Sequence, residues 1–207
     1  MEDKACLNLS CAEYSARLAS DAPVPGGGGA GALAGALGAA LGHMAAELSG
    51  GKKNVDPQVM SGLLTVLENR RREFLDLAAA DAEAFAALAP LYALPKDAPD
   101  RAPRLEAALA QAARPPLNVM EAARDTLSAL CPAAGQCTVL SVSDVGCAAA
   151  LCRAALECGY MNVLANTRLI KNETAARELN AKAASLAREG GERADEIMRI
   201  IEGRLQS

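Results

Sequence analysis

The chain has 207 residues, a formal net charge of −4 and a hydrophobic content of 51%. This length is enough for a sizeable buried core, and we expect one domain over residues 1–207. The acidic balance gives no basic surface for nucleic acid, and only three Tyr, two Phe and no Trp are available to stack on bases. A nucleic-acid partner is therefore not expected.

Helix signals cover almost the whole chain. Apolar periodicity, capping residues and proline positions define these signals. The expected helices are a short one that ends near residue 19, one from the glycine run to about residue 49, then 57–89, 104–113, 117–130, 143–158, a short one that begins or continues at residue 162, and 173–205.

Prolines and one weak strand signal set the expected boundaries. Pro90 is expected to stop the third helix, and Pro115 with Pro116 to separate two shorter helices. A loop is expected over residues 131–141, in which residues 137–142 are a weak strand candidate. No other run of alternating β-branched residues is present, so the sequence predicts an all-α fold, a single bundle of several helices.

Four consecutive glycines, Gly26 to Gly29, open the second helix. Because glycine lacks a Cβ, the backbone here can turn sharply and approach a bound group closely. The following helix N-terminus aims free N–H groups at an anion or a carbonyl. The spacing fits neither G-x-G-x-x-G nor G-x-x-x-x-G-K-[ST], so the run is not a nucleotide-binding loop by pattern. A flexible connection is the alternative interpretation.

The second helix carries a stripe of small residues. Glycine costs about 1 kcal/mol relative to alanine inside a helix, so four of them on one face indicate close packing or ligand access. The stripe consists of Gly31, Gly35, Gly38 and Gly42. The uncharged stretch 30–46 is short and made mostly of Ala and Gly, so no membrane span is expected. The N-terminus lacks a signal-peptide pattern, and a cytoplasmic location is expected.

Several polar residues are candidates for a site. Lys52 and Lys53 follow the second helix, where a solvated helix C-terminus would favour cations in any case. Ser143 fits a helix N-cap with Asp144 in the first turn, and simple helix initiation is the alternative to a functional role.

The remaining candidates are two amides and an acid. Asn162 and Asn166 are four residues apart and share a helical face, which indicates either a polar network or a binding wall. Asp81 lies on a helix rich in Ala and Leu and is either solvated or held for function. One histidine and seven cysteines without a CxxC pair predict no metal site.

The chain resembles the cyclodeaminase/cyclohydrolase family of folate enzymes in four segments, which occur in this order: DAPVPGGGGAGALAGALGAALGHMAAELSGGKK, LPKDAPDRA, RPPLNVMEAA and SDVGCAAALCRAALECGYMNVLAN. This family includes the C-terminal domain of formiminotransferase-cyclodeaminase and stand-alone methenyltetrahydrofolate cyclohydrolases. The resemblance covers nearly the whole chain. This chain departs from the pattern at Gly29, where relatives often carry Ser, and at Asn54, where they often carry an aromatic residue.

The resemblance implies a helical domain that forms a homodimer or higher oligomer and binds a tetrahydrofolate derivative beside the glycine run. No cofactor beyond this substrate is implied. The expected reaction cyclises 5-formiminotetrahydrofolate to 5,10-methenyltetrahydrofolate with release of ammonia. The alternative is the cyclohydrolase reaction, which forms 10-formyltetrahydrofolate. A non-catalytic helical oligomer that binds a folate or a protein is the alternative of another class.

The resemblance also implies roles for the candidate residues. Asp144 is expected to act as a base or to stabilise the cation, with Asp81 as the second group for proton transfer. Lys52 is expected to supply a proton, and either Lys52 or Lys53 to hold the glutamate tail of the folate. The expected binding residues are Gly26, Gly27, Gly28, Gly29, Lys53, Ser143, Asn162 and Asn166.

Overall fold

The structure, a computed structural model, describes residues 3–207, and this part of the chain contains helices and connecting turns only. The all-α prediction is confirmed. The elements are η1 (Asp3–Asn8), α1 (Cys11–Leu18), α2 (Gly27–Ser49), α3 (Pro57–Ala93), α4 (Arg101–Ala112), α5 (Arg114–Gln136), η2 (Val139–Ser141), α6 (Val142–Thr167) and α7 (Glu173–Gln206), where η marks a 3₁₀ turn.

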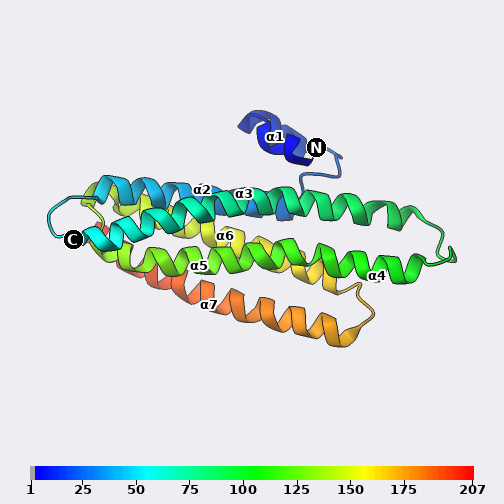
Figure 1. Ribbon diagram of the computed structural model, residues 1–207. Coiled ribbons are helices and arrows are strands. Elements are labelled where there is room, and N and C mark those ends of the chain that lie inside the picture. Colours follow the sequence, from blue (N-terminus) through cyan, green and yellow to red (C-terminus); the bar gives the residue numbers. More distant parts are fainter. Residues whose placement is uncertain (1–2) are drawn as a thin grey trace.

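The long helices lie side by side as a two-layer bundle (Figure 1). Helices α3, α5 and α7 form a three-helix layer in which α5 contacts both neighbours, and α2 and α6 pack against each other as a two-helix layer. The two-helix layer contacts α3, α5 and α7 across the core. Helix α4 extends the line of α5 at one end, while α1 lies apart from the bundle axis (Figure 1).

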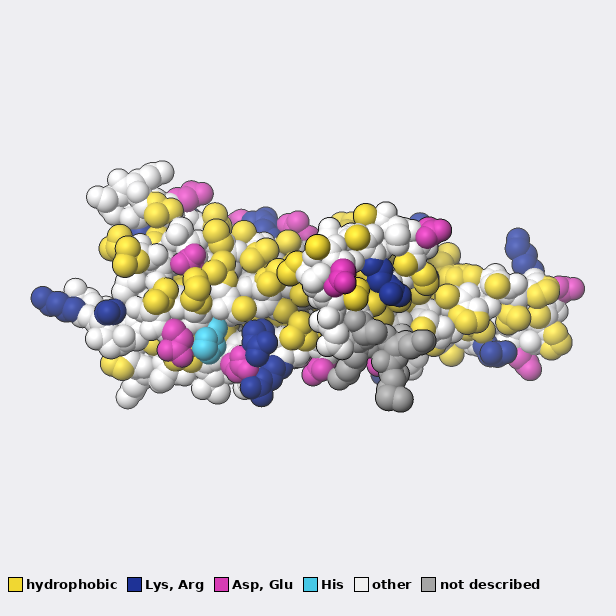
Figure 2. All heavy atoms as spheres, turned by 90° about the horizontal axis from the view of Figure 1, so that it is seen from above, with side chains coloured by type: hydrophobic (Ala, Val, Ile, Leu, Met, Phe, Trp, Pro, Cys, Tyr) yellow, Lys and Arg dark blue, Asp and Glu magenta, His cyan; other side chains and the backbone are white. Residues whose placement is uncertain are grey.

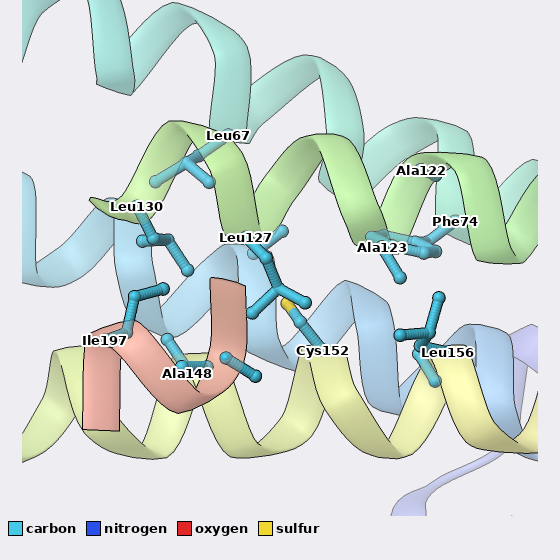
Figure 3. Close-up of a cluster of buried hydrophobic side chains, with 14 of the residues drawn as sticks. Leu67, Phe74, Ala122, Ala123, Leu127, Leu130, Ala148, Cys152, Leu156 and Ile197 are labelled. Atoms are coloured by element: carbon cyan, nitrogen blue, oxygen red, sulfur yellow. The ribbon is translucent and has the colours of Figure 1, made fainter. Parts of the chain in front are cut away.

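Apolar side chains from both layers fill the space between them. Leu127 and Leu130 of α5 point toward α6 and α2, and Leu67 and Phe74 of α3 close the cluster from the side (Figure 3). All four are fully buried, as is Cys152 of α6. Burial of a side chain of this size contributes about 1.5–3 kcal/mol, so this cluster holds the layers together.

The glycine stripe of α2 lets its backbone come close to both neighbours. A Cβ at Gly35 would lie 2.7 Å from Cζ of Phe74, and one at Gly38 would lie 2.9 Å from the carbonyl oxygen of Ala148. Neither contact leaves room for a methyl group. The expected packing role of the stripe therefore accounts for the cost of glycine inside this helix.

The third helix passes through its proline, so the prediction that Pro90 stops it was wrong. Helix α3 continues to Ala93 with Pro90 inside it. The proline removes one backbone hydrogen bond near the helix end. Leu88 and Leu91 on either side are buried, and Leu88 packs with Leu109 of α4. This packing keeps the last turn helical.

Pro115, Pro116 and Pro132 all lie within one helix. The expected separation of two helices near Pro115 is confirmed, because α4 ends at Ala112 and α5 begins at Arg114. Pro115 and Pro116 occupy the first turn of α5, where an N–H has no partner within the helix, so they start this helix directly after α4. Helix α5 then includes Pro132 and ends at Gln136, which replaces most of the expected loop. Arg204 of α7 donates to the carbonyl of Ala134 and stabilises this end.

Two further expectations about the next segment were wrong. The weak strand candidate 137–142 forms the 3₁₀ turn η2 and the start of α6. Ser143 lies inside α6, and Ser141 holds the N-cap position and pairs with the hydroxyl of Thr138. Helix α6 then runs without a break through Cys158 and Asn162 to Thr167.

We predict that Gly38→Ala destabilises the fold by about 1–3 kcal/mol, because the added methyl group overpacks the contact between α2 and α6. Urea unfolding followed by circular dichroism measures the change. Gly62→Ala is the matched control, since its Cβ meets no atom within 4 Å in exposed α3. This control should gain about 0.4–1 kcal/mol. An unchanged unfolding midpoint for Gly38→Ala would contradict the close approach of the two helices.

Candidate functional site

A pocket of about 340 Å³ opens where α2 begins and α6 ends. Its volume falls within the range of about 300–1,000 Å³ that is usual for small-molecule sites. The described residues that line it are Pro23, Val24, Gly26, Gly27, Gly28, Asp81, Phe85, Leu88, Tyr92, Ala112, Asn162, Ala165, Asn166, Arg168 and Leu169. Four segments of the chain therefore meet here: the α2 N-terminus, α3, the end of α4 and the end of α6.

The carboxyl group of Asp81 lies directly against the glycine run. A Cβ at Gly28 would be 2.6 Å from Cγ of Asp81, so no larger residue fits at position 28 without displacing the acid. Burial raises the pKa of Asp81, and a hydrogen bond from the backbone N–H of Gly29 opposes this rise in pKa. Asp81 is thus a partly buried acid beside a helix N-terminus, as a group for proton transfer requires.

The two asparagines share the wall opposite Asp81. Asn162 donates its amide nitrogen to the carbonyl of Cys158 at 2.8 Å, and Asn166 donates to the carbonyl of Ala112 at 3.0 Å. These bonds fix both side chains, and the second one ties the end of α4 to α6. With the amide nitrogens engaged in this way, the amide oxygens remain as hydrogen-bond acceptors. The expectation that both asparagines share one face is confirmed, because both line the pocket.

Sequence reasoning missed two aromatic residues and a cation. Phe85 and Tyr92 line the pocket, although the whole chain has only two Phe and three Tyr. Arg168, just after α6, is the cation among the lining residues. Asp81, Phe85, Leu88 and Tyr92 follow 4-3-4 spacing on one face of α3, which could have revealed the aromatic wall. Ending the helix at Pro90 left Tyr92 out of this pattern.

The other predicted site residues lie at the opposite end of the bundle. Helix α2 has 23 residues, so Lys52 and Lys53 are roughly 35 Å from the glycine run. Ser143 and Asp144 begin α6, and Asp144 is roughly 27 Å along that helix from Asn162. Both lysines are exposed. Within one copy of the chain, the predicted site residues therefore form two groups at opposite ends of the bundle.

The pocket residues together suit a flat polar ligand. Two aromatic side chains can stack on a ring, two amide oxygens and a carboxyl group can accept hydrogen bonds, and Arg168 can pair with an anion. The first-turn N–H groups of α2 point into the same space. Among the described residues, no group of three His, Cys, Asp or Glu side chains could hold a metal ion.

We predict that Asp81→Asn makes the fold less sensitive to pH. The folded-state pKa of Asp81 is raised. The protonated acid therefore makes its full contribution to the free energy of unfolding below its ordinary pKa, and this contribution is lost as pH rises through the raised pKa. The asparagine cannot ionise, so the melting temperature of the variant should match wild type near pH 4 and exceed it increasingly at higher pH. A constant difference across pH would contradict a raised pKa at this position.

Comparison with known proteins identifies the family. The sequence matches the family described as Formiminotransferase-cyclodeaminase over residues 10–185. It is 33% identical to a methenyltetrahydrofolate cyclohydrolase of Methylorubrum extorquens, over 91% of this chain and 93% of that protein. It is 28% identical to the formimidoyltransferase-cyclodeaminase of Rattus norvegicus over 98% of this chain, which spans only 38% of that relative. A solved structure of formiminotetrahydrofolate cyclodeaminase from Thermotoga maritima matches with a TM-score of 0.87 and 28% identity, over 95% of this chain and 98% of the other. This chain belongs to the formiminotransferase-cyclodeaminase family.

Proposed function

We propose that this protein is a folate one-carbon enzyme that cyclises 5-formiminotetrahydrofolate to 5,10-methenyltetrahydrofolate and releases ammonia. The observation that carries this proposal is the acid Asp81, which lies between the glycine N–H groups of α2 and a pocket with an aromatic wall. The relatives named for this activity support the proposal. We place the reaction in the cytoplasm.

The pocket offers a place for each part of the folate. Phe85 and Tyr92 would stack on the pterin or the benzoyl ring, and the oxygens of Asn162 and Asn166 would accept hydrogen bonds from the donors on the pterin edge. Arg168 would pair with a carboxylate of the glutamate tail. Within a single chain, Arg168 would therefore make the contact with the glutamate tail that the sequence analysis expected of Lys52 or Lys53.

Asp81 would move the protons of the reaction. N10 attacks the carbon of the protonated formimino group and forms the new C–N bond as the C=N bond opens to an amino group, and the Asp81 carboxylate takes the proton of N10. The resulting carboxylic acid then protonates the amino nitrogen on the tetrahedral carbon, the C–N bond breaks and ammonia leaves. A raised pKa suits this exchange because it makes the carboxylate a stronger base for the proton of N10 than an ordinary aspartate. We assign no metal or redox cofactor, since only protons and C–N bonds change.

The cyclohydrolase reaction is the second candidate, favoured by the relative of that name, which is 33% identical over 91% of this chain and 93% of its own length. Water would add to the amidinium carbon of methenyltetrahydrofolate while Asp81 takes a proton from the water. Asp81 would return this proton to N5 as the bond between N5 and the carbon breaks, and the remaining O–H would lose its proton to solvent to give the 10-formyl group. The same pocket residues serve both reactions.

We predict that purified protein changes the ultraviolet absorbance of the methenyl chromophore. Absorbance should rise with 5-formiminotetrahydrofolate and ammonia should appear; an accelerated fall with methenyltetrahydrofolate would establish the cyclohydrolase instead. Asp81→Asn should lower the rate roughly 10²- to 10⁴-fold, the usual loss for a proton-transfer group. Asp195→Asn, in the exposed part of α7, is the control and should retain full rate. Folate binding without turnover would support the non-catalytic alternative.

We also propose that the enzyme is a homodimer that packs through the two-helix layer. Helices α2 and α6 are both long and apolar enough to cross a membrane by composition, yet only 56% and 50% of their apolar windows are buried in the bundle. Helices that are apolar on all sides need cover on all sides. Leu37, Met44 and Leu48 of α2 are 54%, 42% and 51% exposed. Figure 2 shows the molecule from above, with α2 and α3 toward the viewer. Apolar side chains cover much of the left half of this view, and charged side chains border them.

A second copy fits this face better than lipid. The three-helix layer is tied by ion pairs along its length, such as Arg70 with Asp125 and Arg124 with Glu189, so the bundle as a whole does not suit a bilayer. Two adjacent helices, each about 35 Å long, present a surface area on the order of 700 Å² per copy. This is close to the roughly 800 Å² that each partner buries in a standard interface. Small residues let a second helix pair approach closely.

An antiparallel twofold arrangement would unite the two groups of predicted site residues. A twofold axis across the middle of α2 would place the end with Lys52 and Asp144 of one copy against the pocket of the other. Exposed apolar side chains occur at both ends: Val139 and Leu140 are 82% and 88% exposed beside the α6 start, and Met161 is 60% exposed near the pocket. In this arrangement Lys52, Lys53, Ser143 and Asp144 would face the partner's substrate. The lysines would join Arg168 at the glutamate tail, and Asp144 would stabilise the cationic carbon while Asp81 moves the protons.

We predict that the wild-type protein has twice the mass of one chain, about 42 kDa against 21.2 kDa, in light scattering after gel filtration. Leu37→Glu should give the single-chain mass, because a charge in the middle of the face cannot be buried. Ala184→Glu on the exposed side of α7 is the control and should stay dimeric. Binding of the wild-type protein to phosphatidylcholine vesicles with a single-chain mass in solution would favour lipid as the cover.

Mixing two inactive variants tests the shared site. Asp81→Asn and Asp144→Asn should each be inactive alone. After unfolding and refolding together, random pairing should restore about a quarter of wild-type activity, since one of the two sites in each mixed dimer is intact. No restoration in a mixture shown to contain mixed dimers would overturn the shared site and leave the dimer itself in place.

A further inference from the structure

The hydroxyl of Tyr14 is buried and has no hydrogen-bond partner among the described residues. Tyr14 is the buried residue of α1 and lines a small cavity with residues of α2 and α3. A buried hydroxyl without a partner costs about 1–3 kcal/mol. Phenylalanine would avoid this cost, so the hydroxyl needs an explanation of its own.

The Tyr14 hydroxyl shares a small cavity with Asp81. This cavity, of about 10 Å³, lies behind the substrate pocket and has room for one water molecule. Its described lining residues are Cys6, Leu7, Tyr14, Pro25, Gly29, Ala78, Asp81 and Ala82. Asp81 lines both cavities, so this residue lies between the candidate pocket and the cavity that holds the Tyr14 side chain.

Gly29 brings the tyrosine and the acid together. Its backbone N–H bonds to Asp81, and a Cβ at this position would lie 3.7 Å from the Tyr14 hydroxyl oxygen. This is an ordinary contact distance, so a serine at position 29 would place its own hydroxyl in the same small cavity. Either the Tyr14 side chain or a serine at position 29 would therefore place a hydroxyl in this cavity.

We propose that Tyr14 is a positioning residue for Asp81 and that its hydroxyl donates, through one water held in the small cavity, to the Asp81 carboxylate. The water would satisfy the hydroxyl and fix the carboxylate oxygen that faces away from the substrate. The orientation of the other oxygen toward the reacting nitrogen would follow. The catalytic part of this proposal rests on the proposed function, whereas the contact itself does not.

The charge balance around Asp81 gives the direction of the effect. The groups that face it are the Tyr14 hydroxyl from α1, the Cys6 thiol from η1, the Gly29 amide from α2 and Arg168 across the pocket. Burial raises the pKa of Tyr14, with smaller contributions from Cys6 and Asp81, so Tyr14 stays protonated and acts as a donor. A donated hydrogen bond stabilises the carboxylate, so its loss should raise the pKa of Asp81 further.

We predict that Tyr14→Phe raises the pKa of Asp81 by about one unit, which corresponds to the usual strength of a hydrogen bond to a charged group. Carbon-13 NMR of aspartate-labelled protein measures this pKa directly, with Asp81→Asn assigning the signal. This readout needs no turnover, so it remains informative if the proposed reaction is wrong. Tyr160→Phe, on the core side of α6, is the matched control and should leave the Asp81 signal unchanged.

The active enzyme gives a second readout. In Tyr14→Phe the acid limb of the kcat/KM profile should move to higher pH by the same amount, with the plateau above it retained. Gly29→Ser in the Tyr14→Phe background should restore the wild-type limb, since it returns a hydroxyl to the cavity. An unchanged Asp81 pKa in Tyr14→Phe would overturn the proposal, as would a uniform loss of rate at every pH without rescue by serine.

Discussion

The close approach of α2 to its neighbours is the constraint on which the rest of the structure depends. Glycine at positions 35 and 38 leaves only backbone between α2 and the side chains of Phe74 and Cys152. The same closeness continues to the N-terminal end, where Gly28 lies against Asp81. Packing and site geometry therefore follow from one sequence feature, because a helix held this close to α3 delivers its free N–H groups to an acid on α3.

The helical class and most helix positions could be predicted from the sequence, while the proline boundaries could not. Local rules treat Pro90 and Pro132 as breaks, since each removes a hydrogen bond. Tertiary burial outweighs that loss: Leu88 and Leu91 are buried beside Pro90, and Arg204 binds the carbonyl near the end of α5. Such compensation comes from residues distant in the sequence, so a local pattern cannot reveal it.

The candidate site was predicted only in part, again because contacts between residues distant in the sequence determine the rest. The glycine run, Asp81, Asn162 and Asn166 meet in one pocket, as their helical spacing and the family resemblance suggested. Tyr92 was missed because the helix was ended too early, and Phe85 because its spacing from Asp81 was not used. Lys52 and Asp144 lie at the far end of α2 and α6 from the pocket; their grouping with it was not predictable, because sequence order does not show which ends of antiparallel helices meet or what a second copy contributes.

The two-helix layer has to satisfy two opposing demands. Glycine and alanine make α2 and α6 thin enough to pack tightly on each other, but they also leave little polar surface on the side that faces away from the core. A monomer with such a layer would expose an apolar face along its whole length. In the proposed dimer a second copy would cover that face and bring polar residues to each pocket, so the small residues that hold the bundle together would also create the need for a dimer. Assembly and the position of the glycine N–H groups beside Asp81 would then depend on the same helix, α2.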